Sequence, residues 1–322
     1  MKKKNNNIIS KAFIFGFIMT IPAIITKMFF KLSEIKYKDK DDENDGFIYK
    51  SNIGDIYYNI KGVGEPILLI HSVNYIGASM KEWEQNIDEL SYNYKVYTLD
   101  LPGFGKSEKP KTTFTAYNYA IIINKFIKDI IKKPCSIIAS NTSCGFVLMS
   151  DRIENGNIKK IININPTGIN YNDIAINSDT KKLKCYEIPY IGNIRYALKT
   201  TKKTISNILE NKVFFNKENI TEDFKNNCIF NARKNGTNSK FSYASYESKF
   251  MNIDIKLSFK HSKTPIYFIW GEENIDNDVS NLNILKEINP NIEFTIFKNT
   301  KMLPHYENNI EFNKIVENFF EK

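Results

Sequence analysis

Apolar runs alternate with amphipathic segments along most of the chain after residue 46. The unbroken apolar run at 66–70 is typical of a strand buried on both faces. Helical spacing of apolar residues follows at 81–90, and a second strand-like run lies at 95–100. Further strands are expected at 135–139, 161–164, 265–270 and 292–297, and further helices at 117–131, 145–152, 282–288 and 310–320. This alternation predicts an α/β fold with a doubly wound, mostly parallel sheet.

The alternation is interrupted between residues 169 and 260, where long helical stretches such as 194–209 replace the strand pattern. At the other end of the domain, short β-like runs at 47–49 and 55–60 predict a hairpin. We therefore expect a domain over 47–322 that carries an inserted helical cap at about 169–260.

The N-terminal residues predict a hydrophobic helix. Three lysines and a polar spacer precede an apolar run at 12–25, and residues 1–31 are expected to form a membrane anchor or signal-like segment. A polar linker over 32–46 follows. No small-x-small cleavage site is visible, which favours an uncleaved anchor. A cleaved signal, which would make the protein secreted, and an interfacial helix remain open. Lysines flank both ends of the run, so the side of the membrane is undetermined.

Charge and composition exclude several classes of function. The formal net charge is +9, but the lysines are interleaved with acidic residues along the chain. Clustered arginines with aromatic residues in a recognisable module are missing, so no nucleic-acid partner is expected. The four cysteines have no C-x-x-C spacing and the three histidines lie far apart, so we expect neither a metal nor another cofactor.

Five motifs resemble those of the α/β-hydrolase superfamily. DLPGFGKS at 100–107 directly follows a predicted strand. The others, in chain order, are His71-Ser72, Asn165-Pro166-Thr167-Gly168, Trp270-Gly271-Glu272 and Leu303-Pro304-His305-Tyr306-Glu307. Their order and spacing match the superfamily from about residue 53 to the end. The resemblance implies a nucleophile, an acid and a histidine base at three separate loops.

The position of the nucleophile is the first of three expected substitutions. The superfamily places it on a tight strand-to-helix turn, G-x-S-x-G, with small residues on either side. Here 137–145 reads IIASNTSCG, and aligning the strand end puts Asn141 at the nucleophile position. Two other registers keep a hydroxyl in place: Thr142 and Ser143 are the alternative nucleophiles. Cys144 falls at a small-residue position and is interpreted as a packing residue.

The acid and the base are the other two expected substitutions. Counting along the W-G-x-x-D pattern reaches Asn274, with Asp276 two residues later as an alternative acid. Setting Pro304 and Glu307 on the pattern G-H-x-P-x-x-E puts Met302 where the histidine belongs, and His305 is the alternative base. The resemblance also implies an oxyanion loop, with backbone donors near Ser72 and Val73.

Two functions follow from this pattern. The first is a membrane-anchored α/β-hydrolase-fold protein without ordinary serine-hydrolase turnover, which binds a small apolar ligand or a protein partner. The alternative is an active hydrolase of ester or acyl bonds that uses a rearranged nucleophile and base. Non-hydrolytic chemistry on the same fold is a third and weaker alternative.

Overall fold

The protein is described here from a computed structural model, which covers residues 22, 24–37, 46–170 and 179–321. Within these ranges the chain forms one eight-stranded sheet of order β1-β2-β4-β3-β5-β6-β7-β8. The strands are β1 Phe47–Ser51, β2 Gly54–Lys61, β3 Glu65–Ile70, β4 Tyr94–Leu99, β5 Cys135–Ser140, β6 Ile158–Ile164, β7 Ile266–Gly271 and β8 Glu293–Phe297.

The sheet is parallel from β4 to β8, and β1 and β2 add an antiparallel hairpin at one edge. Both the hairpin and the parallel strands agree with the sequence prediction. All parallel strands end at the same edge of the sheet, so the loops after β3, β4, β5, β6, β7 and β8 meet there. The candidate functional residues lie in these loops.

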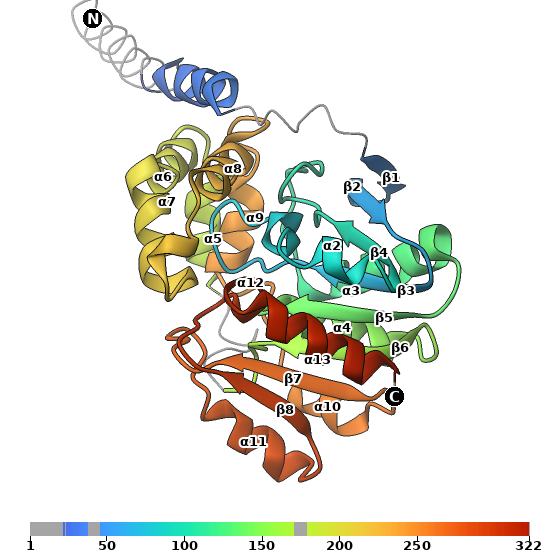
Figure 1. The fold of residues 1–322 in the computed structure, drawn as a ribbon. Helices are drawn as coiled ribbons and strands as arrows, with labels where there is room; N and C mark the ends of the chain where they lie inside the picture. Colours follow the sequence, from blue (N-terminus) through green and yellow to red (C-terminus); the bar gives the residue numbers. More distant parts are fainter. Residues whose placement is uncertain (1–21, 23, 38–45, 171–178, 322) are drawn as a thin grey trace, which may run out of the picture.

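Helices cover both faces of the sheet (Figure 1). The covering elements are the 3₁₀ turn η2 Met80–Trp83, α2 Ile87–Leu90, α3 Ala116–Phe126, the π-helical turn η3 Ile127–Ile131, α4 Ser143–Ile153, α10 Lys256–His261, α11 Asn281–Ile288, α12 Pro304–Glu307 and α13 Asn309–Glu321. Along β3, Leu68 and Ile70 join the apolar cluster beneath α3 and α4, whereas Ile67 and Leu69 join the cluster beneath η2 and α13. Alternate residues of the unbroken apolar strand thus pack on opposite faces.

The cap lies between β6 and β7 and is helical, as predicted (Figure 1). Its elements are α5 Thr180–Glu187, α6 Ile191–Lys199, α7 Lys202–Ile208, the π-helical turn η6 Leu209–Val213, the 3₁₀ turn η7 Lys217–Asn219, α8 Glu222–Arg233 and α9 Lys240–Glu247. The last predicted cap residues, which form α10, instead pack on the sheet domain, where Phe259 contacts Phe268 of β7 edge-to-face.

Two predicted helices are each divided in the structure. The helix expected at 194–209 breaks after Lys199, because the Thr201 hydroxyl caps a new helix by accepting from the Thr204 backbone N–H. The helix expected at 81–90 becomes η2 and α2. Between them, the Asn86 side chain donates to the backbone of His305 and to the Asn313 amide. The Thr201 cap is local in the sequence, whereas the two contacts of Asn86 join residues more than 200 positions apart.

An N-terminal helix covers residues 24–36 and therefore continues into the predicted linker. It rests on the cap, where the Phe30 ring stacks on Tyr196 with centroids 6.0 Å apart. The expected anchor at 1–31 lies mostly outside the described residues, as do residues 38–45 of the linker expected at 32–46. Among helices of the described ranges, none combines the length and apolarity needed to cross a bilayer.

Candidate functional site

The loop after β4 forms one wall of the site and explains the DLPGFGKS motif. The Asp100 carboxylate accepts hydrogen bonds from the backbone N–H groups of Met80 (2.7 Å) and Lys106 (2.6 Å). Gly105 has φ +46°, and a Cβ there would lie 2.1 Å from the Asp100 carboxylate. Only glycine permits this close approach. The motif therefore fixes the turn that lines the cavity described below.

The junction between β5 and α4 is a tight turn centred on Asn141. This residue has φ +55°, in the left-handed region that non-glycine residues rarely adopt. It directly follows Ser140, the last residue of β5, and precedes α4, which begins at Ser143. The buried thiol of Cys144 packs against the turn and contacts the carbonyls of Ala139 (3.2 Å) and Ile164 (3.4 Å). Strand, strained residue and helix form the geometry on which this fold carries a nucleophile.

The Asn141 side chain is buried and hydrogen-bonded. Its Nδ2 donates to the Ser140 hydroxyl at 2.8 Å and to the Met302 carbonyl at 3.3 Å. Asn165 holds the same loop, since its Nδ2 donates to the carbonyls of Lys301 (3.0 Å) and Met302 (3.1 Å). The two predicted positions Asn141 and Met302 therefore lie side by side. Neither side chain can accept a proton from a nucleophile.

The backbone N–H that would stabilise an oxyanion already donates a hydrogen bond to a side-chain amide. In this fold the donor is the N–H of the residue after the nucleophile. Here the Thr142 N–H donates to Asn74 Oδ1 at 3.1 Å. In the predicted oxyanion loop, the Ser72 N–H donates to Glu82 Oε1 at 3.0 Å, and Val73 lines the cavity. At least two backbone donors near the turn are therefore already paired.

The alternative hydroxyl residues also have partners. The Thr142 hydroxyl lies 3.1 Å from the Thr167 hydroxyl. The Ser143 hydroxyl donates to the His71 carbonyl at 2.7 Å and is fully buried. For either residue, the hydrogen bond must be exchanged before the hydroxyl can be deprotonated.

The two predicted acid positions lie in different environments. Asn274 is buried, and its Oδ1 accepts from the Asp276 N–H at 3.2 Å. The Asn274 Nδ2 has no hydrogen-bond partner within the described part of the chain. Asp276 faces the cavity and pairs with Lys212 at 2.9 Å.

His305 is completely buried beside a carboxyl group. Its ring stacks on Trp83 with centroids 4.2 Å apart, and Nε2 lies 3.7 Å from Glu82 Oε1. Neither ring nitrogen has a hydrogen-bond partner among the described residues. Burial lowers the pKa of His305 to about 3 and raises the pKa of Glu82 to about 8, so both groups are neutral near pH 7.

A carboxyl-centred network connects this buried pair to the turn. Ser140, which accepts from Asn141, is hydrogen-bonded to Glu82. Tyr75 donates its phenol to Glu82 Oε2 at 3.2 Å and lines the cavity. The network links the turn, the carboxyl group and the cavity wall, but no hydrogen bond in the described ranges joins His305 to a hydroxyl.

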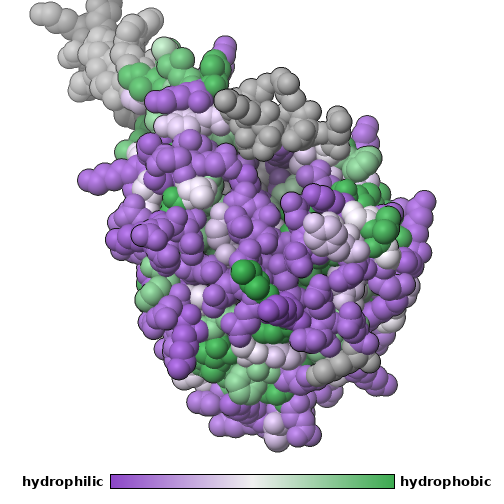
Figure 2. Space-filling model, viewed as in Figure 1, coloured by the Kyte–Doolittle hydropathy of each residue, from purple (hydrophilic) through white to green (hydrophobic). Residues whose placement is uncertain are grey.

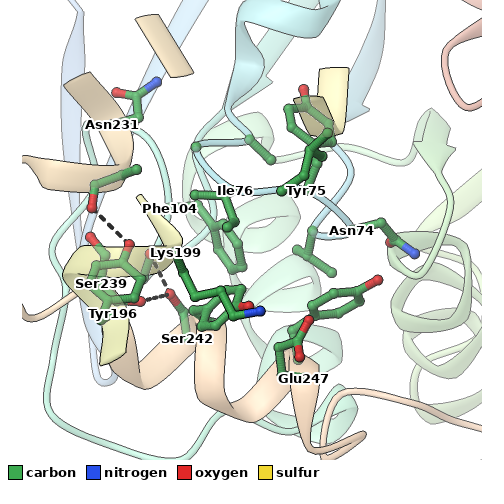
Figure 3. A pocket seen from close by; sticks show the side chains of 18 of the residues that line it. Asn74, Tyr75, Ile76, Phe104, Tyr196, Lys199, Asn231, Ser239, Ser242 and Glu247 are labelled. Atoms are coloured by element: carbon green, nitrogen blue, oxygen red, sulfur yellow. Dashed lines mark hydrogen bonds between the residues drawn. The ribbon is translucent and has the colours of Figure 1, made fainter. Parts of the chain in front are cut away.

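A cavity of about 320 Å³ lies between the sheet domain and the cap (Figure 3). The oxyanion loop contributes Asn74, Tyr75 and Ile76, and the loop after β4 contributes Phe104. The cap contributes polar and aromatic side chains, namely Tyr196, Lys199, Asn231, Ser239, Ser242, Tyr243 and Glu247. Asn141 is not among the lining residues, whereas Asn74 is, so the Asn74 side chain separates the cavity from the turn.

Asn231 is a buried polar residue of the cavity whose side-chain oxygen has no hydrogen-bond partner among the described residues. It lies on α8, and its Nδ2 donates to Asn227 Oδ1 at 2.7 Å. Its Oδ1 is buried without a hydrogen-bond partner among the described residues. An unpaired buried acceptor is costly, and a ligand O–H or N–H group would remove that cost.

Sequence reasoning missed Asn74, Glu82 and Asn231. Asn74 follows the His71-Ser72 motif by two residues, so its position near the oxyanion loop was available from the sequence. Glu82 and Asn231 lie on helical segments with no motif, and only tertiary packing identifies them. Among the described residues, no cluster of three or more histidine, cysteine or acidic residues could hold a metal ion.

The sheet order, the turn at Asn141 and the cap define an α/β-hydrolase fold, and comparison with known proteins supports this class. The model of the alpha/beta hydrolase fold family matches residues 65–135. A 2-hydroxy-6-oxo-6-(2'-aminophenyl)hexa-2,4-dienoic acid hydrolase of Metapseudomonas resinovorans is 29% identical over 98 residues, which is 30% of this chain and 33% of that protein. The matched segments cover a third or less of the curated relatives' own length.

Solved structures share the fold over nearly the whole chain. The crystal structure of a membrane phospholipase A has a TM-score of 0.70 at 17% identity and covers all of this chain and 98% of its own. The meta-cleavage product hydrolase of Pseudomonas fluorescens IP01 has a TM-score of 0.68 at 16% identity and covers 85% of this chain and 98% of its own. At these identities the likeness shows the fold alone.

Proposed function

We propose that this protein is a membrane-associated α/β-hydrolase-fold protein that binds a small, mainly apolar ligand beneath its cap and lacks ordinary serine-hydrolase turnover. The observation that carries the proposal is the set of side chains at the turn. Asn141 occupies the nucleophile position, and Met302 lies beside it. Asn74 accepts the hydrogen bond of the backbone N–H that would otherwise be available to an oxyanion.

The chemistry of these residues argues against acyl transfer. A carboxamide is not nucleophilic, and a thioether is not basic enough to accept a proton. The alternative base His305 has a lowered pKa, and neither of its ring nitrogens is hydrogen-bonded to a hydroxyl of the described residues. Restoring turnover would therefore require new partners for the nucleophile, for the base and for the Thr142 N–H.

The cavity supports binding instead. Its volume of about 320 Å³ lies within the range of small-molecule sites, and apolar side chains such as Ile76 and Phe104 line it. Asn231 Oδ1 offers a buried acceptor without a partner in the described ranges. We infer a ligand with an apolar body and one hydroxyl or N–H donor.

An active ester or acyl hydrolase is the second candidate, and the comparisons favour it. Several matched relatives bear the names of hydrolases or esterases, including a pimeloyl-[acyl-carrier protein] methyl ester esterase of Vibrio atlanticus, 35% identical over 52 residues. On this candidate, Thr142 or Ser143 is the nucleophile, His305 the base and Asp276 the acid. Side-chain rearrangement would then have to bring these groups together.

Activity-based labelling of the full chain separates the two candidates. The purified protein is treated with a fluorophosphonate probe and assayed with p-nitrophenyl esters of short and long acids. The binding proposal expects neither adduct nor turnover from a folded protein. An adduct on Thr142 or Ser143, with turnover abolished by His305→Ala, would instead establish the hydrolase.

A fluorescent apolar probe tests binding directly. N-phenyl-1-naphthylamine is expected to bind saturably, and Ile208→Trp, which narrows the cavity from α7, is expected to weaken binding at least about tenfold. The matched control is Ile191→Trp, a similar change at an exposed cap residue that does not line the cavity. Equal binding by both variants would contradict the assigned site.

Membrane association is the remaining part of the proposal. Its support is the apolar sequence at 12–25 and the fold shared with a membrane phospholipase A. Flotation of the full chain with lipid vesicles tests it, and protein that stays at the bottom of the gradient would contradict it.

A further inference from the structure

The helix at residues 24–36 has two faces of different character. Thr26, Phe30 and Ser33 are buried against the rest of the molecule. Five apolar side chains are between 56% and 68% exposed, namely Ile24, Ile25, Met28, Leu32 and Ile35. At 100° per residue these five side chains fall within one stripe opposite the buried face.

Contacts on the buried face fix the direction of the exposed stripe. Phe30 stacks on Tyr196, and the buried Arg233 donates to the Ser33 hydroxyl and to the Thr200 carbonyl. The Arg233 guanidinium also lies 4.4 Å from the centre of the Phe29 ring. Rotating the helix to bury the stripe would break all of these contacts, so the stripe points away from the cap.

Basic residues flank the exposed stripe. Lys27 and Lys31 lie along one side and Lys36 along the other, and all three are exposed. Glu34 is the single acidic residue between 24 and 37. In the space-filling view, hydrophobic (green) and hydrophilic (purple) residues meet at the top of the molecule, beside the grey segment (Figure 2).

We propose that this helix lies in the plane of an anionic lipid surface, with the stripe among the acyl chains and the three lysines at the headgroup phosphates. The inference deepens the proposed membrane association and rests on it. A narrow apolar stripe with lysines on both sides is the pattern of an interfacial helix. A protein partner would not explain why the apolar sequence continues through 12–25, directly before the stripe.

The helix proposed to lie on the lipid surface is also close to the cavity. Tyr196 contacts Phe30 of the helix and also lines the cavity. The cavity is therefore separated from the helix by one aromatic side chain. Seated in this way, the cap faces the lipid, and an apolar ligand has a short path between the bilayer and the cavity.

Tryptophan quenching in the full chain tests the orientation. Ile24→Trp and Leu32→Trp report from two ends of the stripe, and Ile310→Trp on α13 is the control at another exposed isoleucine. The native Trp83 and Trp270 are fully buried and serve as internal references. Vesicles contain phosphatidylcholine and phosphatidylglycerol, with phosphatidylcholine brominated either near the headgroup or near the chain end.

The proposal expects Ile24→Trp and Leu32→Trp to be quenched to a similar extent, more by the shallow bromines than by the deep ones, with Ile310→Trp unaffected. Deep quenching of Ile24→Trp alone would mean that the helix enters the bilayer steeply, which overturns the in-plane orientation. Vesicle binding without quenching of either stripe residue overturns the inference but leaves membrane association intact. Absence of vesicle binding overturns both.

A charge variant tests the lipid chemistry. Replacing Lys27, Lys31 and Lys36 with glutamine is expected to weaken binding to the anionic vesicles roughly ten- to a hundredfold. The matched control replaces three other exposed lysines, Lys260, Lys263 and Lys298, and is expected to have a smaller effect. Equal losses in the two variants would show that net charge, rather than this helix, governs binding.

Discussion

The turn at Asn141 and the cavity beneath the cap lie next to each other but differ in how their polar groups are paired. At the turn, the Asn141 amide, the Ser143 hydroxyl and the Thr142 N–H all have protein partners. In the cavity, Asn231 Oδ1 has none within the described part of the chain. The side chain of Asn74 stands between the two regions.

This difference in hydrogen bonding bears on whether the site binds a ligand or catalyses a reaction. A hydrolase needs open hydrogen-bond positions where charge develops in the transition state. Here Asn231 Oδ1 is an open position in the cavity, whereas the Thr142 N–H and the Ser72 N–H near the turn are paired. The turn has a left-handed backbone at Asn141, and its polar side chains hydrogen-bond within the protein.

The largest expected effect comes from rebuilding the turn as a catalytic site. Combining Asn141→Ser, Met302→His and Asn274→Asp restores the three residue types of the triad. Adding Asn74→Gly frees the Thr142 N–H and joins the turn to the cavity. We expect turnover of p-nitrophenyl butyrate by the fourfold variant, roughly 10²-fold faster than by the threefold variant, because one oxyanion donor has an effect of about that size.

The control for this prediction is the fourfold variant with alanine at position 141, which lacks the nucleophile and should be inactive. Equal rates with and without Asn74→Gly would contradict the role given to Asn74.

The second effect concerns the backbone strain at the turn. Asn141→Val places a β-branched residue at φ +55°, and we expect a loss of about 2 to 4 kcal/mol in the free energy of unfolding, measured with urea. Asn141→Gly suits the backbone and should cost less, about 1 kcal/mol for the lost amide hydrogen bonds. If valine and glycine were equally destabilising, strain would not be the cause.

Much of the fold could be predicted from the sequence, and the reasons are local. The unbroken apolar run at β3 predicts a buried strand because it is apolar on both faces. The turn at 139–145 follows from small residues that directly succeed a strand. The contacts of Asn86 with His305 and Asn313 and the stacking of His305 on Trp83 depend on residues far apart in the chain. The hydrogen bond from the Thr142 N–H to Asn74 likewise joins two loops that are distant in the sequence, so no local pattern predicts it.

The third effect is a pH dependence of stability that originates beneath the turn. Burial raises the pKa of Glu82 from its ordinary value near 4.5 to about 8. Between these values the folded state holds a proton that the unfolded state has released, so stability falls as pH rises. The expected slope approaches about 1 kcal/mol for each pH unit. Thermal melts from pH 6.5 to 8 measure it, because below about pH 6.5 the buried His305 contributes a slope of opposite sign.

Glu82→Gln should remove most of this slope, because a neutral amide cannot titrate. His305 acts in the opposite direction, since its lowered pKa means that stability is lost as pH falls below about 6.5. A slope between pH 6.5 and 8 that is unchanged in Glu82→Gln would contradict the raised pKa of Glu82.

The smallest expected effect is at Asn231 in the cavity, whose side-chain oxygen has no partner among the described residues. Asn231→Leu keeps the side-chain volume similar and removes an acceptor without a partner in the described ranges. Asn227 Oδ1, which loses the Asn231 donor, still accepts from the Ser79 hydroxyl at 3.2 Å. Replacing an unpaired polar group by an apolar one is close to neutral, so the change in unfolding free energy should stay within about 1 kcal/mol. The corresponding Asn141→Leu, measured in the same urea titration, should be clearly destabilising because it removes two hydrogen bonds and strains the backbone. A large loss of unfolding free energy in Asn231→Leu would mean that this cavity residue supports the fold as Asn141 does. The contrast between a fully hydrogen-bonded turn residue and a cavity residue with an unpaired oxygen would then fail.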